Sequence, residues 1–195
     1  THVEGTIDPL RDIEIINTEL CLADMESVEK RIERLGKLLK TGDKKVPLEK
    51  AALEKVLAGL GEAIPARRLA LTDEEKEFAK ALQLLTLKPI LYITNVAEDE
   101  VAHAEKNPFV QAVQKYAAEE GAESIAVSAK MEAEIAELPE DEAQEFLAMA
   151  GLEEPGLNRI IKAGFKLLGL MTYITAGEIE VRAWTIVRGT KAPQA

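Results

Sequence analysis

Residues 90–98 read ILYITNVAE, and this stretch decides the fold. Residues 90–94 form a short apolar, β-rich run after Pro89, which is typical of a buried parallel strand. A polar loop follows directly. Further along, an amphipathic pattern predicts a helix over about 107–120, and Gly121 closes it. The stretch therefore predicts a strand, a polar loop and a covering helix.

The same order repeats downstream. Residues 123–127 predict a second strand, and Ser128-Ala129-Lys130 forms a second polar loop; three helices are predicted over 131–138, 140–149 and 156–168. Alternating strands and helices are the signature of an α/β domain, in which ligands bind at the carboxyl ends of the strands. Both polar loops are expected at that edge.

The segment before this domain predicts paired helices. Asp8-Pro9 reads as a cap with proline at the first helical position. Two apolar stripes at coiled-coil spacing follow, and they run through Met25, Val28, Ile32, Leu35 and Leu39, then through Leu53, Val56, Leu57, Leu60 and Ile64. The short polar turn 41–43 separates them. We expect an antiparallel helical hairpin within 21–85 that projects from the α/β domain.

Two further signals flank the α/β domain. Thr72 with Glu75 three residues later predicts a capping box at the start of a helix. Residues 170–175 and 180–187 alternate apolar and polar side chains around a turn at Ala176-Gly177. This second pattern predicts a β-hairpin that begins a new domain.

Composition excludes several classes of function. The chain is 47% hydrophobic with a net charge of −11, so it can form a core and repels nucleic acid as a whole. The single cysteine, Cys21, cannot form an internal disulfide, and we expect an inert packing thiol in a reducing, cytoplasmic compartment. His2 and His103 are too few and too far apart for a metal site or a catalytic triad.

Clustered charges carry two alternatives. Between Glu29 and Lys50 the chain has eight basic and four acidic residues, a charge of +4 that leaves −15 for the rest. These lysines are either a solvated helix face or a local contact for a ribosome or nucleic acid. The strongest candidates for that contact are Lys37, Lys40, Lys44 and Lys45. The acidic residues 132, 134, 137 and 140–142 are expected to be solvated helix faces.

The loops after the two strands resemble base-recognition motifs. Asn95-Val96-Ala97-Glu98 stands where GTPases carry Asn-Lys-x-Asp, whose Asp accepts two hydrogen bonds from guanine. Ser128-Ala129-Lys130 stands where GTPases carry Ser-Ala-Lys. Taken alone, each motif favours an ordinary surface loop over a nucleotide site. The two motifs together follow consecutive strands with one helix between them. This spacing leaves a nucleotide site and a pair of ordinary surface loops as equal alternatives.

The phosphate-binding half of such a site does not occur in the sequence. A P-loop needs G-x-x-x-x-G-K-[ST], whose backbone amides and lysine hold the phosphates. Gly151/Gly156 and Gly164/Gly169 have the glycine spacing, but leucine follows each pair. We therefore expect neither ATP hydrolysis nor tight ATP binding from these 195 residues alone, and no catalytic residue among them.

Several long motifs together resemble the YchF family of Obg-like P-loop ATPases. They are DIEIINTEL at 12–20, KPILYITNVAE at 88–98, AEIAEL at 133–138, TYITA at 172–176 with VRAWTI at 181–186, and KAPQA at 191–195. The resemblance covers essentially the whole chain. It implies an internal fragment of such a protein, with the P-loop, the switch segment and the Mg²⁺ ligands before Thr1.

The resemblance also implies domains, ligands and partners. Residues 1–20 with 86–168 would be part of a GTPase-like nucleotide-binding domain, 21–85 an inserted coiled-coil hairpin, and 169–195 the start of a TGS domain. The family binds ATP in preference to GTP, hydrolyses it with Mg²⁺ and associates with ribosomes; a monomer is expected. The base-binding positions would be Asn95, Val96, Glu98, Ser128, Ala129 and Lys130. The alternative is a non-enzymatic coiled-coil protein or ribosome interaction module.

Overall fold

The first helix, α1 (Pro9–Leu38), begins at the predicted cap. In the computed structural model, which describes residues 7–39 and 43–191, the Asp8 side chain accepts a hydrogen bond from the Arg11 backbone N–H at 3.1 Å, and Pro9 occupies the first helical position. Asp8 thus satisfies one of the amides that a helix start leaves unpaired.

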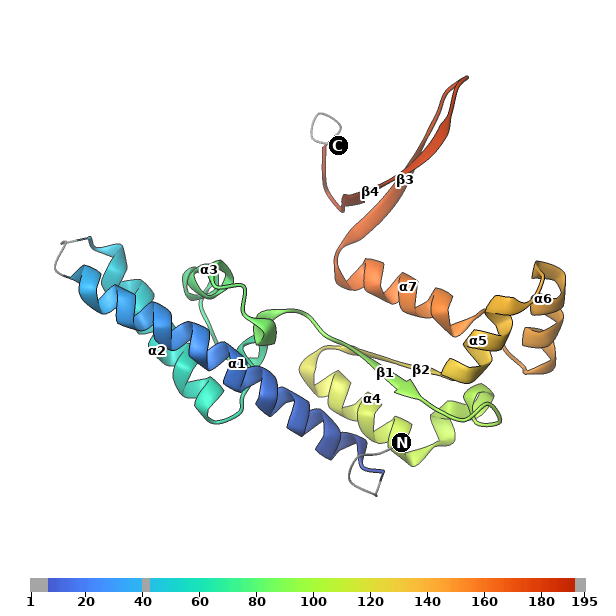
Figure 1. The fold of residues 1–195 in the computed structure, drawn as a ribbon, viewed down its shortest axis with the longest axis horizontal. Helices are drawn as coiled ribbons and strands as arrows, with labels where there is room; N and C mark the ends of the chain where they lie inside the picture. Colours follow the sequence, from blue (N-terminus) through green and yellow to red (C-terminus); the bar gives the residue numbers. More distant parts are fainter. Residues whose placement is uncertain (1–6, 40–42, 192–195) are drawn as a thin grey trace. The chain divides into compact units, whose positions relative to one another are not determined.

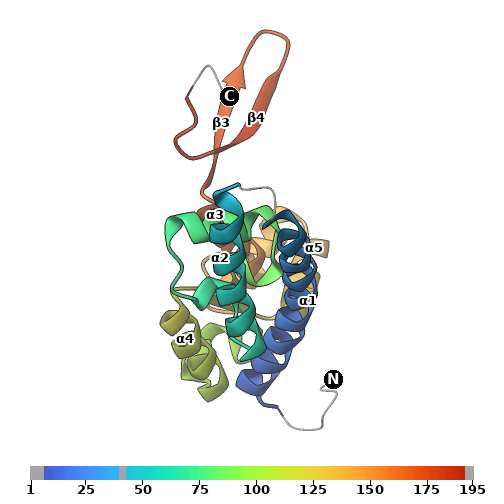
Figure 2. The same cartoon turned by 90° about the vertical axis from the view of Figure 1, so that its left-hand side faces the viewer.

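Helix α2 (Lys45–Gly61) lies alongside α1, as Figures 1 and 2 both show. Val28 and Leu35 of α1 are buried in one cluster with Leu53, Val56 and Leu60 of α2. The Arg31 guanidinium lies 2.6 Å from the Glu49 carboxylate, so the end of α1 meets the beginning of α2 and the helices run in opposite directions. That the pair is an inserted, projecting coiled coil stays a prediction.

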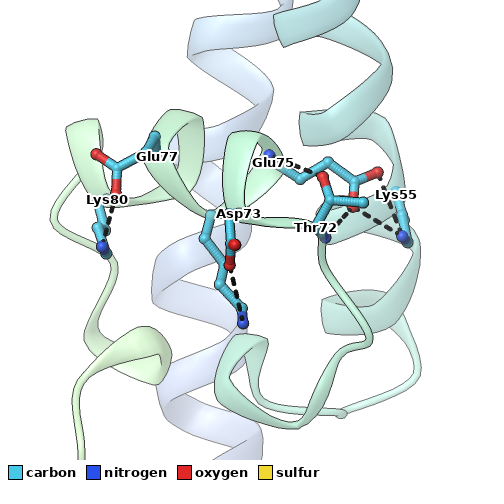
Figure 3. A network of polar contacts seen from close by, with 7 residues as sticks. Lys55, Thr72, Asp73, Glu75, Glu77 and Lys80 are labelled. Atoms are coloured by element: carbon cyan, nitrogen blue, oxygen red, sulfur yellow. Dashed lines mark hydrogen bonds and ion pairs between the residues drawn. The ribbon is translucent and has the colours of Figure 1, made fainter.

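A short helix, α3 (Asp73–Ala81), starts at the predicted capping box (Figure 3). The Glu75 N–H donates to Thr72 Oγ1 at 3.2 Å, and the Thr72 N–H donates to Glu75 Oε2 at 2.7 Å. Lys55 of α2 adds an ion pair to the same carboxylate at 3.0 Å. The backbone hydrogen bond from Thr72, followed by the Lys55 contact, lowers the pKa of Glu75.

A buried polar network, which the sequence analysis did not predict, ties α1 to two 3₁₀ turns, η2 (Ala66–Arg68) and η3 (Leu85–Leu87). The Asp24 carboxylate accepts from the Leu85 N–H at 2.8 Å, and from the Thr86 N–H and hydroxyl at 2.7 and 2.6 Å. Arg67 Nη2 donates to Asn17 Oδ1 at 3.1 Å. Asp24, Asn17 and Thr86 are all buried, which requires such partners.

The second compact unit begins at Pro89, after a first unit of residues 1–88. Its strands β1 (Leu91–Asn95) and β2 (Glu123–Val127) are parallel and in register from Leu91↔Glu123 to Asn95↔Val127. The predicted α/β class is therefore confirmed. The domain division at residues 20, 86 and 168 stays a prediction.

Helices cover both faces of this small sheet. Ile125 and Val127 pack against Ala163 of α7 (Gly156–Leu167), whereas Ala126, which alternates with them, packs with Val110 of α4 (Pro108–Glu120). The Asn107 side chain caps α4, and Gly121 ends it with φ +70°, as predicted. A 3₁₀ turn, η4 (Val101–Lys106), connects the loop after β1 to α4 and was not predicted.

The remaining elements follow the predicted order with small shifts of their ends. They are α5 (Ala129–Glu137), α6 (Glu140–Met149), β3 (Leu170–Ala176) and β4 (Val181–Val187). Strands β3 and β4 form an antiparallel hairpin, paired from Leu170↔Val187 to Ala176↔Val181. That this hairpin begins a TGS domain stays a prediction. Within residues 7–39 and 43–191, no helix is both long enough and apolar enough to cross a membrane.

Candidate functional site

The two polar loops meet at one edge of the β1–β2 sheet. The parallel register places Asn95 beside Val127, the last residue of each strand. The chain stays paired for one more residue, because the Val96 N–H donates to the Val127 carbonyl at 2.8 Å. Beyond that point the loops border an open hollow of about 390 Å³, lined by Asn95, Val96, Ala97, Glu98, Asp99, Ser128 and Lys130.

Asn95 joins the two loops directly. Its Oδ1 accepts a hydrogen bond from the Ala129 N–H at 2.9 Å. Ala129 is the first residue of α5, so its amide has no partner within the helix and is available to this side chain. Because a backbone N–H can only donate, the contact fixes which end of the Asn95 amide is the oxygen. The Asn95 amide nitrogen is left as the donor end of the side chain.

Glu98 and Lys130 form an ion pair at the rim of the hollow. Lys130 Nζ lies 2.8 Å from Glu98 Oε1 and 3.8 Å from Glu134 Oε1. The hydrogen bond with Glu98, reinforced by its charge, raises the pKa of Lys130. The Lys130 side chain is 74% exposed and that of Glu98 36%, so this is a rim ion pair with little effect on stability.

At the base of the two loops, Ser128 is buried and Val96 is partly buried. Ser128 is 2% exposed, and its carbonyl accepts the Glu132 N–H that closes the first turn of α5. Val96 packs with two apolar clusters beneath the loop, one around Met131 and one around Val110. Its side chain therefore anchors the loop, while its backbone continues the sheet toward the hollow.

Glu132 corrects the prediction of a wholly solvated acidic face on α5. Its carboxylate accepts from the Gly156 N–H at 2.7 Å and from the Leu157 N–H at 2.9 Å. These are the first amides of α7, whose capping position is Pro155, a residue without a side-chain acceptor. The signal in the sequence was this missing cap, because a helix that starts directly after a proline needs a side-chain acceptor from elsewhere.

The candidate basic residues lie in the other unit. Lys37 is exposed and pairs with Glu33 at 2.7 Å, and Lys44 and Lys45 are exposed at the start of α2. Lys40 lies outside the described residues. The hydrogen bond from Lys37, followed by its charge, lowers the pKa of Glu33.

The cysteine and the histidine considered in the sequence analysis, Cys21 and His103, do not line the hollow. Cys21 is buried in the α1–α2 cluster, and burial is the main cause that raises the pKa of its thiol. His103 is exposed in η4. Across residues 7–39 and 43–191, no group of three or more His, Cys, Asp or Glu side chains could hold a metal ion.

Comparisons with known proteins identify relatives along the whole chain. It is 53% identical over 194 residues to the ribosome-binding ATPase YchF of Bacillus subtilis and 51% identical over 194 residues to that of Haemophilus influenzae. Each alignment covers 100% of this chain and 53% of the relative. The chain therefore spans about half the length of the curated relatives it matches. No family model matches it.

A solved structure gives the same result for the fold. The structure titled as the Schizosaccharomyces pombe YchF GTPase matches with a TM-score of 0.85 and 37% identity over 100% of this chain and 53% of that one. These relatives differ in activity, since the bacterial proteins are described as ATPases and the fission-yeast protein as a GTPase. The relatives therefore do not determine whether adenine or guanine is preferred, and that preference has to be inferred from the residues that line the hollow.

Proposed function

We propose that this chain, which belongs to the YchF family, carries the base-binding half of an ATP site in a ribosome-associated ATPase. The activity, the nucleotide and the ribosome as partner are those of relatives about twice its length. The cytoplasm is the compartment that such a partner implies. Helices α1 and α2 would be the coiled-coil insertion of this protein, and β3–β4 the start of its TGS domain.

The hydrogen bond between Asn95 and Ala129 is the observation that carries the proposal. It joins the loops that follow two adjacent parallel strands, at the edge where α/β sheets bind ligands. It also turns the amide nitrogen of Asn95 into the available donor. A purine presents N7 as an acceptor in both adenine and guanine, so this donor can hold either base.

The choice of adenine would depend on Glu98. In the guanine motif an aspartate at this position accepts from the ring N–H and the amino group of the base. Glu98 is one methylene longer, and its carboxylate lies on Lys130 at 2.8 Å. The longer stem should keep the carboxylate from reaching, without strain, the position in which an aspartate accepts both guanine donors. Adenine lacks the ring N–H donor and loses nothing at this position.

Phosphate binding and hydrolysis would need residues beyond these loops. The sequence has no P-loop motif, and the described residues offer no cluster of metal ligands. Mg²⁺ would therefore enter with ATP and be held elsewhere, so we derive no step through it from this chain. Since phosphates and metal supply the catalysis in this class, the 195 residues alone should be inactive.

The direct test of the base site is an amide deletion in the full-length protein. Asn95→Ala should weaken ATP and GTP alike by about tenfold, because a good hydrogen bond is worth about 1.5 kcal/mol. Asn158→Ala, a change of the same type at an exposed position of α7, is the matched control. Titration of both variants with the two nucleotides decides the matter. If wild type and Asn95→Ala bind ATP and GTP with equal affinity, these loops do not bind the base.

The non-enzymatic interaction module remains as the second candidate, because exposed Lys44 and Lys45 lie beside the connection between α1 and α2. Reversing Lys37, Lys40, Lys44 and Lys45 to Glu should weaken ribosome association and flatten its salt dependence. The control reverses the same number of exposed lysines, Lys76, Lys88, Lys106 and Lys115. If the module is the whole function, the reversed variant loses ribosomes while wild type binds no nucleotide.

A further inference from the structure

Glu132 links the two helices that begin beside the second loop of the hollow, α5 and α7. It lies in the first turns of α5, one turn after Ser128, and its own N–H donates to the Ser128 carbonyl at 3.0 Å. Its side chain reaches in the opposite direction, to the Gly156 and Leu157 amides at 2.7 and 2.9 Å. One residue thus links the start of α5 to the start of α7.

Gly156, at the start of α7, packs very closely against the end of β2 and against Glu132. A Cβ added to Gly156 would lie 2.7 Å from Val127 Cγ1 and 2.9 Å from Glu132 Oε1, distances that no side chain tolerates. Val127 is the last residue of β2 and immediately precedes Ser128. Only glycine therefore lets the first turn of α7 lie against both the strand end and the Glu132 carboxylate.

The negative charge of Glu132 is favourable at the N-terminus of α7. A helix start carries unpaired N–H groups and a partial positive charge, and a carboxylate that accepts two of these amides makes charge-assisted hydrogen bonds. Pro155, the residue at the capping position, offers no side-chain acceptor. Glu132 is half-buried, so water can replace these bonds only in part.

The geometry points to Glu132 as a positioning residue for the base site, acting on the loop 128–130. The loop has two anchors: Asn95 binds Ala129 from the β1 side, and Glu132 fixes the next turn of α5 on α7. With the second anchor weakened, only the apolar packing of Met131 and Ile135 positions α5, and a small shift of the helix would carry Ala129 and Lys130 with it. This inference rests on the proposed function, because it assumes that the hollow receives the base.

Glu132→Gln in the full-length protein tests it. Glutamine has the same shape, but its amide group can accept from only one of the two N–H groups and places a donor against the other. Loss of one charge-assisted bond corresponds to about a tenfold change in an equilibrium constant. We expect KM for ATP to rise about three- to tenfold with kcat almost unchanged, because base binding is felt equally in the ground and transition states.

A second measurement separates positioning from general loss of structure. Inorganic triphosphate lacks a base, so its inhibition constant against ATP hydrolysis should be the same in wild type and Glu132→Gln. Glu137→Gln, the same substitution at an exposed position of α5, should change neither quantity. If Glu132→Gln does not fold, Glu132→Asp keeps the charge on a shorter stem and should give the same pattern with a smaller rise in KM.

The outcomes distinguish this inference from the proposed function. Unchanged KM for ATP in Glu132→Gln, with wild type and Asn95→Ala still differing, overturns the role of Glu132 alone. An equal loss of ATP and inorganic triphosphate binding also overturns it, because the effect is then not confined to the base. Wild-type protein that does not discriminate ATP from inorganic triphosphate overturns the base site itself.

Discussion

Asp24→Asn should destabilise the first unit strongly, because the Asp24 carboxylate is the acceptor at the centre of its buried network. Asp24 is 3% exposed and accepts from the Leu85 N–H, the Thr86 N–H and the Thr86 hydroxyl at 2.8, 2.7 and 2.6 Å. Two of these bonds go to Oδ2. Asparagine keeps one oxygen and places an amino group against the remaining donors.

The magnitude follows from the bonds lost. A hydrogen bond to a charged group contributes about 1.5–3 kcal/mol, and a buried amide left without a partner costs about 1–3 kcal/mol. The Thr86 hydroxyl can turn toward other groups, but the Thr86 N–H cannot. We therefore expect the free energy of unfolding to fall by about 3 kcal/mol, a value between one bond lost and two.

Urea denaturation of the 195-residue chain, followed by circular dichroism at pH 7, measures this change. The control is Glu19→Gln, the corresponding substitution at an exposed position of α1, which should alter stability by less than about 0.5 kcal/mol. Thr86→Val completes a double-mutant cycle, and it should show strong coupling with Asp24→Asn. A loss below about 1 kcal/mol, or additive effects of the two variants, would refute the reasoning.

Three further predictions follow from burial and composition. Leu53→Ala, at a side chain with 0% exposure, should cost about 2–5 kcal/mol in urea denaturation, whereas Leu48→Ala, at a side chain 53% exposed on the same helix, should cost little; equal costs would contradict the packing of α2 on α1. The raised pKa of Cys21 leaves less thiolate at any given pH, so Ellman's reagent at pH 8 should react slowly with the folded chain and quickly in denaturant; rapid reaction of the native protein would show that α1 opens readily. The purified 195-residue chain should release no phosphate from ATP above a buffer blank, and release that persists through further purification would show that a phosphate site is present after all.

The sequence was sufficient where one local pattern determines the structure. The cap at Asp8-Pro9, the capping box at Thr72 and the left-handed Gly121 were predicted because each depends on residues within a few positions. The parallel strands followed from apolar runs separated by one helix, and the two loops then had to lie at the same edge.

Contacts between distant residues were not predictable in this way. Asp24 meets Thr86 and Glu132 meets Gly156, and no periodicity relates the members of either pair. The sequence also did not reveal that the Val96 side chain packs into the apolar clusters beneath its loop. Side-chain direction in a loop depends on the tertiary core, which a local pattern does not contain.

The most direct test of the central claim is the ratio of ATP to GTP affinity in full-length wild type and Glu98→Asp. The single change is sharper than one that also replaces Val96 with lysine, because a lysine there would enter an apolar cluster. Aspartate is one methylene shorter, which should let its carboxylate accept both guanine donors. The account predicts that wild type prefers ATP and that Glu98→Asp shifts the ratio toward GTP by about ten- to a hundredfold, as a well-placed polar pair worth about 1–3 kcal/mol allows. A ratio that stays at the wild-type value would contradict it, because this loop would then not read the base.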